Sequence, residues 1–591
     1  MLARSLGRLG ILAAVIAVGA LLPATAPAAG APAVVVSPLP GTPDANPSTQ
    51  ISFLGAAASH LADIVVTGSA SGSHSGRLLY YSTHTGGSFV PTSPFQPGEH
   101  VTVSATVVGY GAPAHIGTSF DVSAPYTLPA PASGPPEKAT PTNTMRFHSR
   151  HDLEPPALTV TTAAADPSLG DIFVSPDSGP GQAGPMIVSP LGRLIWFDPL
   201  AAGTIASDLD VQSYAGAPVL TWWQGQVVEG HGQGVDVIES DNYAPVTTVH
   251  AGNGLYADLH DFEVTAQGTA WITAFAPQHL DLSSVGGLAD GLLDDGVIQE
   301  IDIKTGLVMF EWSALGHVAI SDTYMSIPHY PGEVLDYFHL NSIDPLANGD
   351  LLVSSRNTWT TYLISEQSGA VLWRLGGKHS SFSFAAGAKF AWQHDAQLLP
   401  DGTISLFDNE AAPAEARQSR VLDIALDTTA DTATVVRQLT YPGQGILSDS
   451  QGDVQELPNG DDFVGWGQAG EVSEFSRAGQ LTFDMHFVSS ANSYRAFRFP
   501  WSAQPTTAPA VLAASVSHGA REVWASWNGA TAVAAWRVLA GSSPKSLRAI
   551  GTYASTGFET AIRAPTSAPL VQVQALSASG PVLASSPATR H

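Results

Sequence analysis

Residues 347–355 read Ala-Asn-Gly-Asp-Leu-Leu-Val-Ser-Ser, a tight-turn dipeptide followed by a β-rich run. The same pattern, with Asp-Gly or Asn-Gly at the turn, recurs at 400–407 and 458–464, and a degenerate copy with Gln-Gly lies at 266–273. Asn and Gly tolerate the positive φ angles that short hairpin turns require. Each copy therefore predicts a pair of antiparallel strands.

A second element alternates with these turns. It is a glycine followed by an apolar run with an aromatic residue, at 192–197, 306–312, 369–374 and 479–483. Repetition at roughly 40 to 80 residues is typical of a β-propeller, in which each unit is a four-stranded blade. We predict an all-β fold with a six-bladed β-propeller over residues 150–503. A series of stacked sandwiches is the alternative, but its strands would not recur in this order.

The flanking regions have different patterns. Short alternating runs at 31–125 predict an N-terminal β-sandwich, and a Pro-rich linker follows at 126–149. Residues 507–591 resemble a C-terminal β-sandwich of the immunoglobulin or fibronectin kind. The acidic stretch 288–296 lacks the spacing of an EF-hand, and we expect a solvated turn there.

The amino terminus and the composition limit where the protein can be located and which partners it can bind. Residues 1–30 combine basic, apolar and small-residue segments, which predicts a secretory signal peptide, with an uncleaved N-terminal anchor as the alternative. No later stretch is long and apolar enough to span a membrane, so we expect a secreted or cell-surface protein. The net charge of −27 argues against nucleic acid as a partner, and the absence of cysteine excludes disulfides and thiolate metal sites.

Four polar residues occupy comparable places in the repeat. His260, His339 and His394 each precede a hairpin turn, and Arg356 ends the strand that follows the turn at 348–349. Equivalent positions on successive blades converge on the axis of a propeller. Each histidine alone is more easily explained as a hydrogen-bonded structural residue, but their shared register predicts one common site.

The region from about 231 to 413 resembles the bacterial and fungal arylsulfotransferases that use no nucleotide sulfate donor. The matching segments are His231-Gly-Gln-Gly, Ala257-Asp-Leu-His-Asp-Phe, Phe338-His-Leu-Asn-Ser-Ile, Val353-Ser-Ser-Arg-Asn, Trp373-Arg-Leu-Gly-Gly, Trp392-Gln-His-Asp-Ala and Leu406-Phe-Asp-Asn. The resemblance implies a six-bladed propeller with its site on the axis and His394 as the residue that accepts the sulfuryl group. It also implies supporting roles for His260, His339, Arg356 and Asn341. Periplasmic members carry a disulfide, which this chain cannot form.

The chemistry agrees with these residue types. Arginine and histidine donors can spread the negative charge of a sulfate ester, and a neutral imidazole is a good nucleophile that forms a covalent intermediate. We therefore expect a phenolic sulfate as donor and a phenol as acceptor, with no cofactor and no metal. The oligomeric state is not predictable from the sequence.

Three other functions are compatible with parts of the pattern. The three histidines with Asp261 and Asp395 would form a Zn²⁺ site, although Arg356 in the same cluster opposes a cation. A noncatalytic extracellular propeller for binding or adhesion is the second alternative, since a fold does not settle function. A quinone-dependent dehydrogenase is the third, and the cysteine and cation-ligand patterns expected for it are missing.

Overall fold

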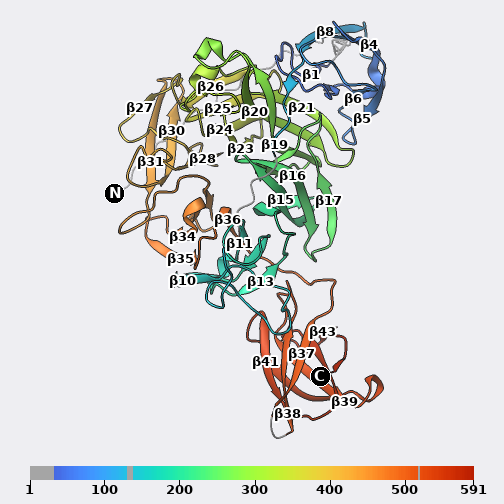
Figure 1. The fold of residues 1–591 in the computed structure, drawn as a ribbon, viewed down its shortest axis with the longest axis vertical. Coiled ribbons are helices and arrows are strands. Elements are labelled where there is room, and N and C mark those ends of the chain that lie inside the picture. Colours follow the sequence, from blue (N-terminus) through green and yellow to red (C-terminus); the bar gives the residue numbers. More distant parts are fainter. Residues whose placement is uncertain (1–31, 130–136, 517–518, 591) are drawn as a thin grey trace, which may run out of the picture.

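The computed structural model describes residues 32–129, 137–516 and 519–590. Within these ranges strands dominate and the helices are three-residue 3-10 turns, which confirms the all-β prediction. Figure 1 shows a ring of sheets, with a β unit formed by the start of the chain beside it and another formed by the end of the chain below it. The 3-10 turns are η1 (Ala58–His60), η2 (Pro167–Leu169), η3 (Ser283–Val285), η4 (Ile320–Asp322), η5 (Gly467–Ala469) and η6 (Pro544–Ser546).

The ring is built from mainly antiparallel sheets that follow one another along the chain, a propeller-like arrangement (Figure 1), and the pairs β20–β22 and β27–β31 are parallel. Its sheets have the strand orders β13-β12-β11-β36, β14-β15-β16-β18-β19-β20-β21, β23-β24-β25-β26, β27-β31-β30-β29-β28 and β10-β35-β34-β33-β32, and β9, β17 and β22 pair with the second of them. The strands are β9 (Ala124–Pro125), β10 (Leu158–Thr162), β11 (Asp171–Pro176), β12 (Met186–Val188), β13 (Leu194–Phe197), β14 (Ile205–Tyr214), β15 (Ala217–Val228), β16 (His231–Ser240), β17 (Pro245–Val249), β18 (Ala257–Val264), β19 (Thr269–Leu280), β20 (Gly291–Asp302), β21 (Leu307–Ser313), β22 (Val334–Asp336), β23 (Leu340–Pro345), β24 (Asp350–Ser355), β25 (Thr360–Ser365), β26 (Val371–Gly376), β27 (Ser383–Phe384), β28 (His394–Leu398), β29 (Ile404–Asp408), β30 (Arg420–Asp427), β31 (Thr432–Leu439), β32 (Asp453–Glu456), β33 (Asp462–Gly465), β34 (Glu471–Phe475), β35 (Leu481–Phe487) and β36 (Ser493–Phe499).

One strand of each repeat lines the centre of the ring. β14, β18, β23, β28, β32 and β36 are neighbours in that order, and β36 in turn contacts β14. Apolar side chains between adjacent sheets form separate clusters around this circle, so the core is a ring and not a single centre. Residues on the central strands therefore face one another from different repeats.

The repeated motifs of the sequence take the positions predicted for them. The turns joining β18 to β19, β23 to β24, β28 to β29 and β32 to β33 each contain a glycine with φ between 80° and 87°, at Gly268, Gly349, Gly402 and Gly460. The glycines before the aromatic runs likewise have φ between 69° and 76°, and they lie just before the starts of β13, β21, β26 and β35. A side chain at such a φ is strained, which explains why both motifs contain glycine.

The ring is closed by two strands from opposite ends of its sequence. β10, the first, pairs with β35, and β36, the last, pairs with β11. The first strand of the ring thus belongs to the sheet of late strands, and the last strand belongs to the sheet of early strands. Strand pairing between the two ends of the sequence therefore closes the ring.

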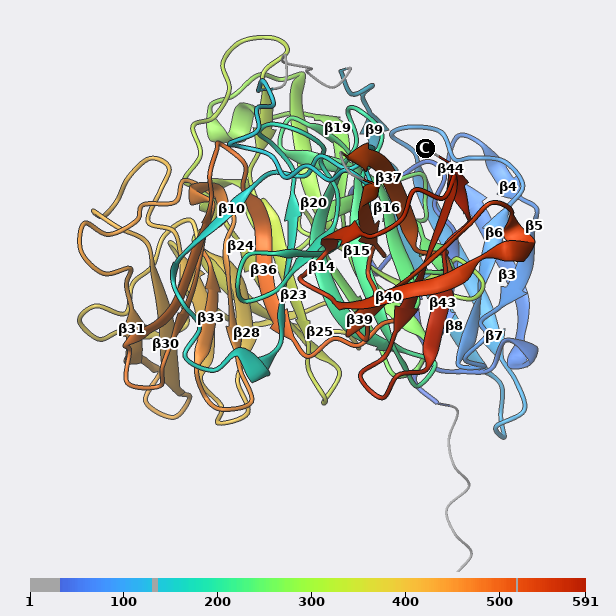
Figure 2. The ribbon, with the colours of Figure 1, turned by 90° about the horizontal axis from the view of Figure 1, so that it is seen from below.

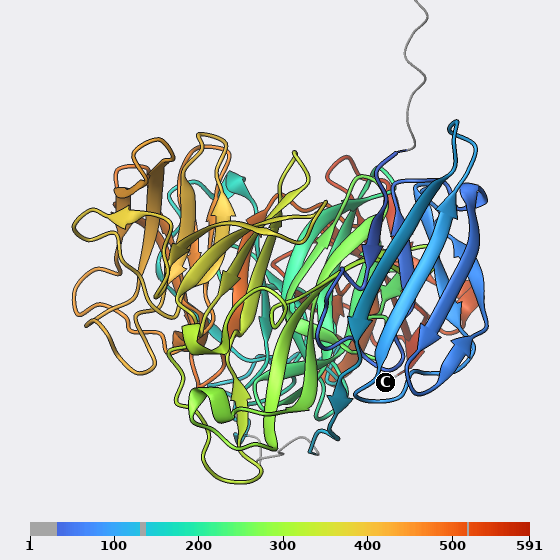
Figure 3. The same ribbon diagram turned by 90° about the horizontal axis from the view of Figure 1, so that it is seen from above.

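The N-terminal unit consists of two four-stranded sheets around a shared apolar core. It packs on the edge of the ring at β21, where Ser52 Oγ donates a hydrogen bond to the Val308 carbonyl at 2.6 Å. Figure 3 shows this unit beside the ring. Its strands are β1 (Val35–Ser37), β2 (Ile51–Leu54), β3 (Leu61–Gly68), β4 (Gly72–His74), β5 (Gly76–Tyr80), β6 (Gly86–Pro91), β7 (His100–Val107) and β8 (Ala114–Asp121).

The C-terminal unit has sheets of three and five strands around its own core. Asn528 joins it to the ring, because its amide exchanges two hydrogen bonds with the backbone of Phe197, at 3.0 and 2.9 Å. Figure 2 shows the unit in front of the ring. Its strands are β37 (Ala510–Val516), β38 (Ala520–Ser526), β39 (Ala535–Gly541), β40 (Arg548–Ala554), β41 (Glu559–Ala564), β42 (Leu570–Leu576), β43 (Val582–Ser585) and β44 (Thr589–Arg590).

One local prediction is wrong. The stretch 288–296 is not a solvated turn, because β20 begins at Gly291, pairs with β19 and β22 here, and buries Asp294 and Asp295. The predicted signal peptide at 1–30 and residues 130–136 of the predicted linker lie outside the described residues. None of the helices in the described ranges has the length and apolarity needed to cross a membrane.

Candidate functional site

The central strands carry the histidines that the sequence singled out. His260 lies in β18, His394 begins β28, and His339 directly precedes β23. Each of these strands has an irregular register with its neighbour at this point, and such bulges turn side chains out of the regular alternation. The rings of His260 and His339 lie 4.9 Å apart, and the ring of Tyr494 lies 5.4 Å from His260 and 6.2 Å from His394. The three predicted histidines are thus brought together.

Two of the histidines are held by carboxylates. Nδ1 of His260 donates to Asp258 at 2.5 Å, and Nδ1 of His339 donates to Asp336. Asp258 also accepts the backbone N–H of Gly232 at 2.5 Å, which fixes its orientation. Burial lowers the pKa of His339 to about 4 even though Asp336 opposes the shift. In both rings the Nδ1 atom is engaged, which leaves Nε2 for other partners.

His394 is held by an amide instead. Its Nδ1 donates to Asn409 Oδ1 at 2.7 Å, and the backbone N–H of Gln451 donates to Nε2 at 3.2 Å. The Asn409 amide is fixed in turn by the carbonyl oxygens of Gln451 and Ser448, at 2.8 and 3.2 Å. Because a backbone N–H can only donate, Nε2 must carry the lone pair. Burial and the charge of Arg356 hold the pKa of His394 well below its ordinary value, so this imidazole is neutral.

Arg356 and Asn341 complete the predicted set. The guanidinium of Arg356 lies 4.8 Å from the ring centre of Trp392 and donates to the Asp449 carbonyl at 3.2 Å, while its Nε is buried without a partner. Asn341 donates to the Gln393 carbonyl at 2.7 Å, and its Oδ1 is also buried without a partner. Both side chains keep polar atoms that the protein does not satisfy.

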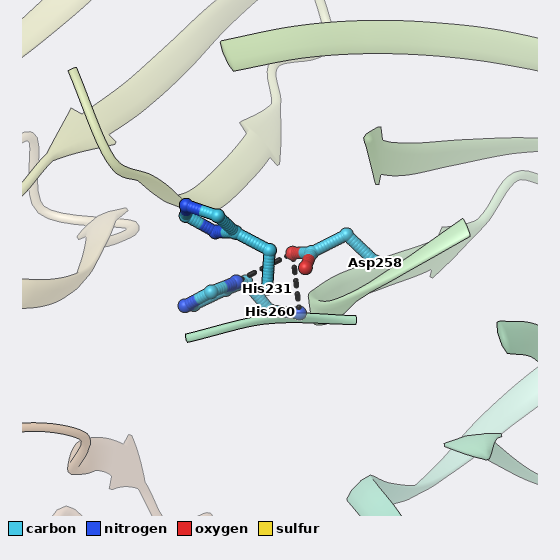
Figure 4. A group of neighbouring side chains, drawn as sticks. All are labelled: His231, Asp258 and His260. Atoms are coloured by element: carbon cyan, nitrogen blue, oxygen red, sulfur yellow. Dashed lines mark hydrogen bonds and ion pairs between the residues drawn. The ribbon is translucent and has the colours of Figure 1, made fainter. Parts of the chain in front are cut away.

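A fourth histidine belongs to the cluster and was not predicted as a site residue. His231 begins β16, is only 5% exposed, and stacks on Phe275 with ring centres 3.5 Å apart. Its ring lies 5.3 Å from His339 and 6.3 Å from His260. Figure 4 shows His231 beside His260 and Asp258. Burial opposes protonation, but the charge of Asp336 raises the pKa of His231 to about 9. The one sequence signal for it is the His231-Gly-Gln-Gly segment, since no hairpin turn of the repeat follows it.

A buried arginine organises the ring beside the histidines. Arg495 on β36 lies 3.1 Å from Asp208 and 3.1 Å from Asp261, and its other terminal nitrogen lies 3.6 Å from Asp395. The alternative prediction of a Zn²⁺ site therefore named the wrong carboxylates, because Asp261 and Asp395 both face the guanidinium of Arg495 and not the histidines. The carboxylates beside the histidines are Asp258 and Asp336.

Comparison with known proteins bears on this site. The family model described as Arylsulfotransferase (ASST) matches residues 210–488. The match supports an assignment of this region to the arylsulfotransferase family. The arylsulfotransferase match runs from β14 to just past β35 and contains every predicted site residue, whereas Tyr494 and Arg495 lie just beyond it. The assignment supports aryl sulfotransferase activity and hence small phenolic substrates.

Other comparisons are more distant. No curated protein matches the chain. A protein of unknown function from Bacteroides caccae is 12% identical, with 56% of this chain and 98% of that chain covered and a TM-score of 0.35. Virginiamycin B lyase from Staphylococcus aureus is 10% identical, with 63% and 96% covered and a TM-score of 0.27. A quinonprotein alcohol dehydrogenase-like protein from Bacteroides thetaiotaomicron is 9% identical, with 94% and 95% covered and a TM-score of 0.24. Likenesses at these scores say nothing of what this chain does.

Proposed function

We propose that this protein transfers a sulfuryl group from a phenolic sulfate ester to a phenol, with His394 as the nucleophile. The observation that supports this role is the partner of each ring: Asn409 accepts from His394, whereas carboxylates accept from His260 and His339. A carboxylate stabilises the protonated form of an imidazole, and an amide does so far less. His394 is therefore the ring best suited to stay neutral with a free lone pair.

The reaction divides into two half-reactions. In the first, the Nε2 lone pair of His394 gives up its hydrogen bond from Gln451 and attacks sulfur. The N–S bond forms, the bond between sulfur and the phenolic oxygen breaks, and its electron pair leaves with the phenolate. In the second, the oxygen of the acceptor attacks sulfur, the N–S bond breaks, and His394 returns to its neutral form. A covalent intermediate thus splits one difficult step into two easier ones.

The remaining residues handle charge and protons. Arg356 and Asn341 carry unsatisfied polar atoms, and the guanidinium of Arg356 neutralises the sulfuryl oxygens as fixed cations do in phosphoryl transfer. His260, held through Nδ1 by Asp258, donates a proton from Nε2 to the leaving phenolate and takes it back from the acceptor. His339, with its pKa lowered to about 4, is neutral and has no proton on Nε2 to donate while its Nδ1 donates to Asp336.

A direct assay tests this proposal. The full chain is incubated with an aryl sulfate that releases a coloured phenol, with and without a second phenol as acceptor. Excess donor without acceptor should leave one sulfuryl group on His394, detectable by mass spectrometry. His394→Ala should lose both the turnover and the adduct, and His279→Ala, at an exposed histidine, should keep both. A sulfuryl group found on another residue contradicts the role of His394. No transfer from a panel of aryl sulfates favours the noncatalytic binding propeller.

The proposal includes the architecture and the compartment. We take the ring as a six-bladed propeller over 150–503, supported by its six central strands. The flanking units at 31–125 and 507–591 are taken as β-sandwiches, joined to the ring on one side by the linker at 126–149, and the signal segment at 1–30 directs the protein out of the cytoplasm. Antibody accessibility on intact cells and in the culture medium tests the location.

A further inference from the structure

One carboxylate beside the site is shared by two histidines. Asp336 Oδ2 accepts the Nδ1 proton of His339, and the Nε2 atom of His231 lies 3.4 Å from the same oxygen. A second carboxylate oxygen, Asp294 Oδ2, lies 3.8 Å from His231 Nε2. The hydroxyl of Tyr126 holds Asp294 in place by donating to its Oδ1 at 2.7 Å. The charge of Asp336 can stabilise a second proton on either ring, so the surroundings decide which of the two is charged.

The surroundings favour a charged His231. One of its ring nitrogens also lies within 4.8 Å of a carboxylate oxygen of Asp258, so carboxylates from three strands, β18, β20 and β22, lie around it. One face of the ring stacks on Phe275, with ring centres 3.5 Å apart. Burial opposes protonation, yet these carboxylates, led by Asp336, raise the pKa of His231 to about 9. His231 is therefore protonated at neutral pH.

His339 remains neutral beside this charge. The ring of His231 lies 5.3 Å from it, and the ring of His260 lies 4.9 Å from it. Burial and the charge of these two rings outweigh Asp336 and lower the pKa of His339 to about 4. The charge of Asp336 is thus balanced by the proton on His231 and not by a second proton on His339. The charged and titratable groups around the two rings are Asp258, His260, Asp294, Asp336, Arg356 and His394.

The charge of His231 matters because the donor in the proposed reaction is an anion. Asp294 and Asp336 line a cavity of about 470 Å³ together with Glu229 and Glu333, and no lysine or arginine is among the described residues that line it. Carboxylates in such a position repel an anionic substrate unless a cation offsets them. The proton on His231 provides that cation where Asp294 and Asp336 meet the histidines.

We propose that His231 is a positioning residue that stays protonated as the counter-ion of Asp336 and Asp294, so that the anionic donor enters the site while His339 stays neutral. This inference rests on the proposed sulfuryl transfer, because it assigns a role in donor binding. His231 acts through the two carboxylates and exchanges no proton with either substrate.

Nuclear magnetic resonance of the full chain, labelled with ¹⁵N in its histidines, tests the charges directly. His231 should have both ring nitrogens protonated at pH 7 and lose a proton near pH 9, whereas His339 should take up its second proton only near pH 4. His231→Gln removes the charge and keeps a polar side chain. At an effective dielectric constant of about 20, a charge on a ring 5.3 Å away accounts for about 2 pH units, so the titration of His339 should move upward by about that amount.

Kinetics with nitrophenyl sulfate test the role in donor binding. This phenolate leaves without being protonated, so the proton on His260 does not shape the pH profile. The donor kcat/KM of the natural protein should fall near pH 9, because the charge of His231 is complete below that pH and lost above it. In His231→Gln it should be about tenfold lower at pH 8 and recover at lower pH, as His339 becomes protonated. The KM of an uncharged acceptor phenol should change little, whereas a structural defect would affect both substrates at every pH.

Two further variants keep the test decisive. Asp294→Asn covers the case in which His231→Gln does not fold, and it should move the titration of His231 to lower pH because one stabilising carboxylate is lost. His279→Gln removes an exposed histidine that pairs with Asp290 at 2.8 Å and should change neither the titrations nor the kinetics.

A neutral His231 at pH 7 overturns the inference, as does a donor kcat/KM that His231→Gln leaves unchanged at pH 8. If the natural protein transfers no sulfuryl group, the proposed function fails while the titrations still test the charge assignment. If transfer occurs and folded His231→Gln keeps the natural profile, only this inference fails.

Discussion

Asn409→Asp should convert the partner of His394 from an amide into a carboxylate without changing its shape. The new charge would stand 2.7 Å from Nδ1 in a buried setting. An opposite charge at such a distance typically raises a pKa by about 1–3 units, which equals about 1.4–4 kcal/mol in favour of the protonated ring. Because the pKa of His394 starts well below its ordinary value, protonation should now remove the nucleophile at a higher pH than in the natural protein.

The assay is the pH dependence of the first half-reaction, followed as the burst of coloured phenol. The acid limb of the profile should move to higher pH by about 1–3 units. At pH values well above this limb, where His394 is neutral in both proteins, the rate should change less. The variant also loses donors to the carbonyl oxygens of Ser448 and Gln451, and each unsatisfied acceptor costs about 1–3 kcal/mol of stability. Thermal unfolding must therefore accompany the kinetics.

A matched control is Asn242→Asp. The oxygen of Asn242 accepts from Ser240 Oγ and the Ala244 N–H at 2.8 and 3.2 Å, so an aspartate replaces it without losing either bond. This variant should keep the natural pH profile. If folded Asn409→Asp also keeps the natural acid limb, the role of the amide in holding His394 neutral is refuted.

Three other outcomes are expected. Arg356→Lys should lose about 10²–10³-fold in rate, because an ammonium lacks the planar donor fork, and a natural rate in the same aryl sulfate assay contradicts this. Removing residues 507–591 should leave the chemistry intact, which turnover by the folded truncated chain checks. Glu99→Gln should flatten the acid dependence of unfolding. Burial opposes ionisation of Glu99, but hydrogen bonds led by those from Ser71 lower its pKa to about 2, so the stability it provides is complete above its ordinary pKa and lost as the pH falls toward 2. Denaturant unfolding between pH 2 and pH 5 should show a shallower loss in the variant.

Much of the fold could be predicted because the hairpin turns require particular residues. Because glycine is needed at Gly349 and its equivalents, the hairpins and the order of strands are visible in the sequence, and the register of His260, His339 and His394 follows from them. The clustering of these three rings is therefore predictable from the amino-acid sequence alone.

Residues outside that register were not found. His231 follows the turn at Glu229 and Gly230 instead of preceding one of the repeat turns, so it lies outside the register of the other histidines. Arg495 lies on the strand that closes the ring, so its contacts with Asp208 and Asp261 depend on ring closure. The sequence predicted a turn at Asp294 because the segment is acidic and contains glycine. Its burial comes from strand pairing, which the local sequence does not indicate. These are long-range effects that a local pattern does not record.

The exchange of strands at the two ends of the ring sets the order in which the site can be made. β36 is the last strand of the ring to be synthesised, and it brings Tyr494 between His260 and His394 and Arg495 among three buried carboxylates. On a nascent chain that ends before β36, those carboxylates have no counter-ion, and their repulsion opposes assembly of the centre. The site therefore cannot form until β36 has been synthesised, and a chain terminated before β36 should be both inactive and unstable.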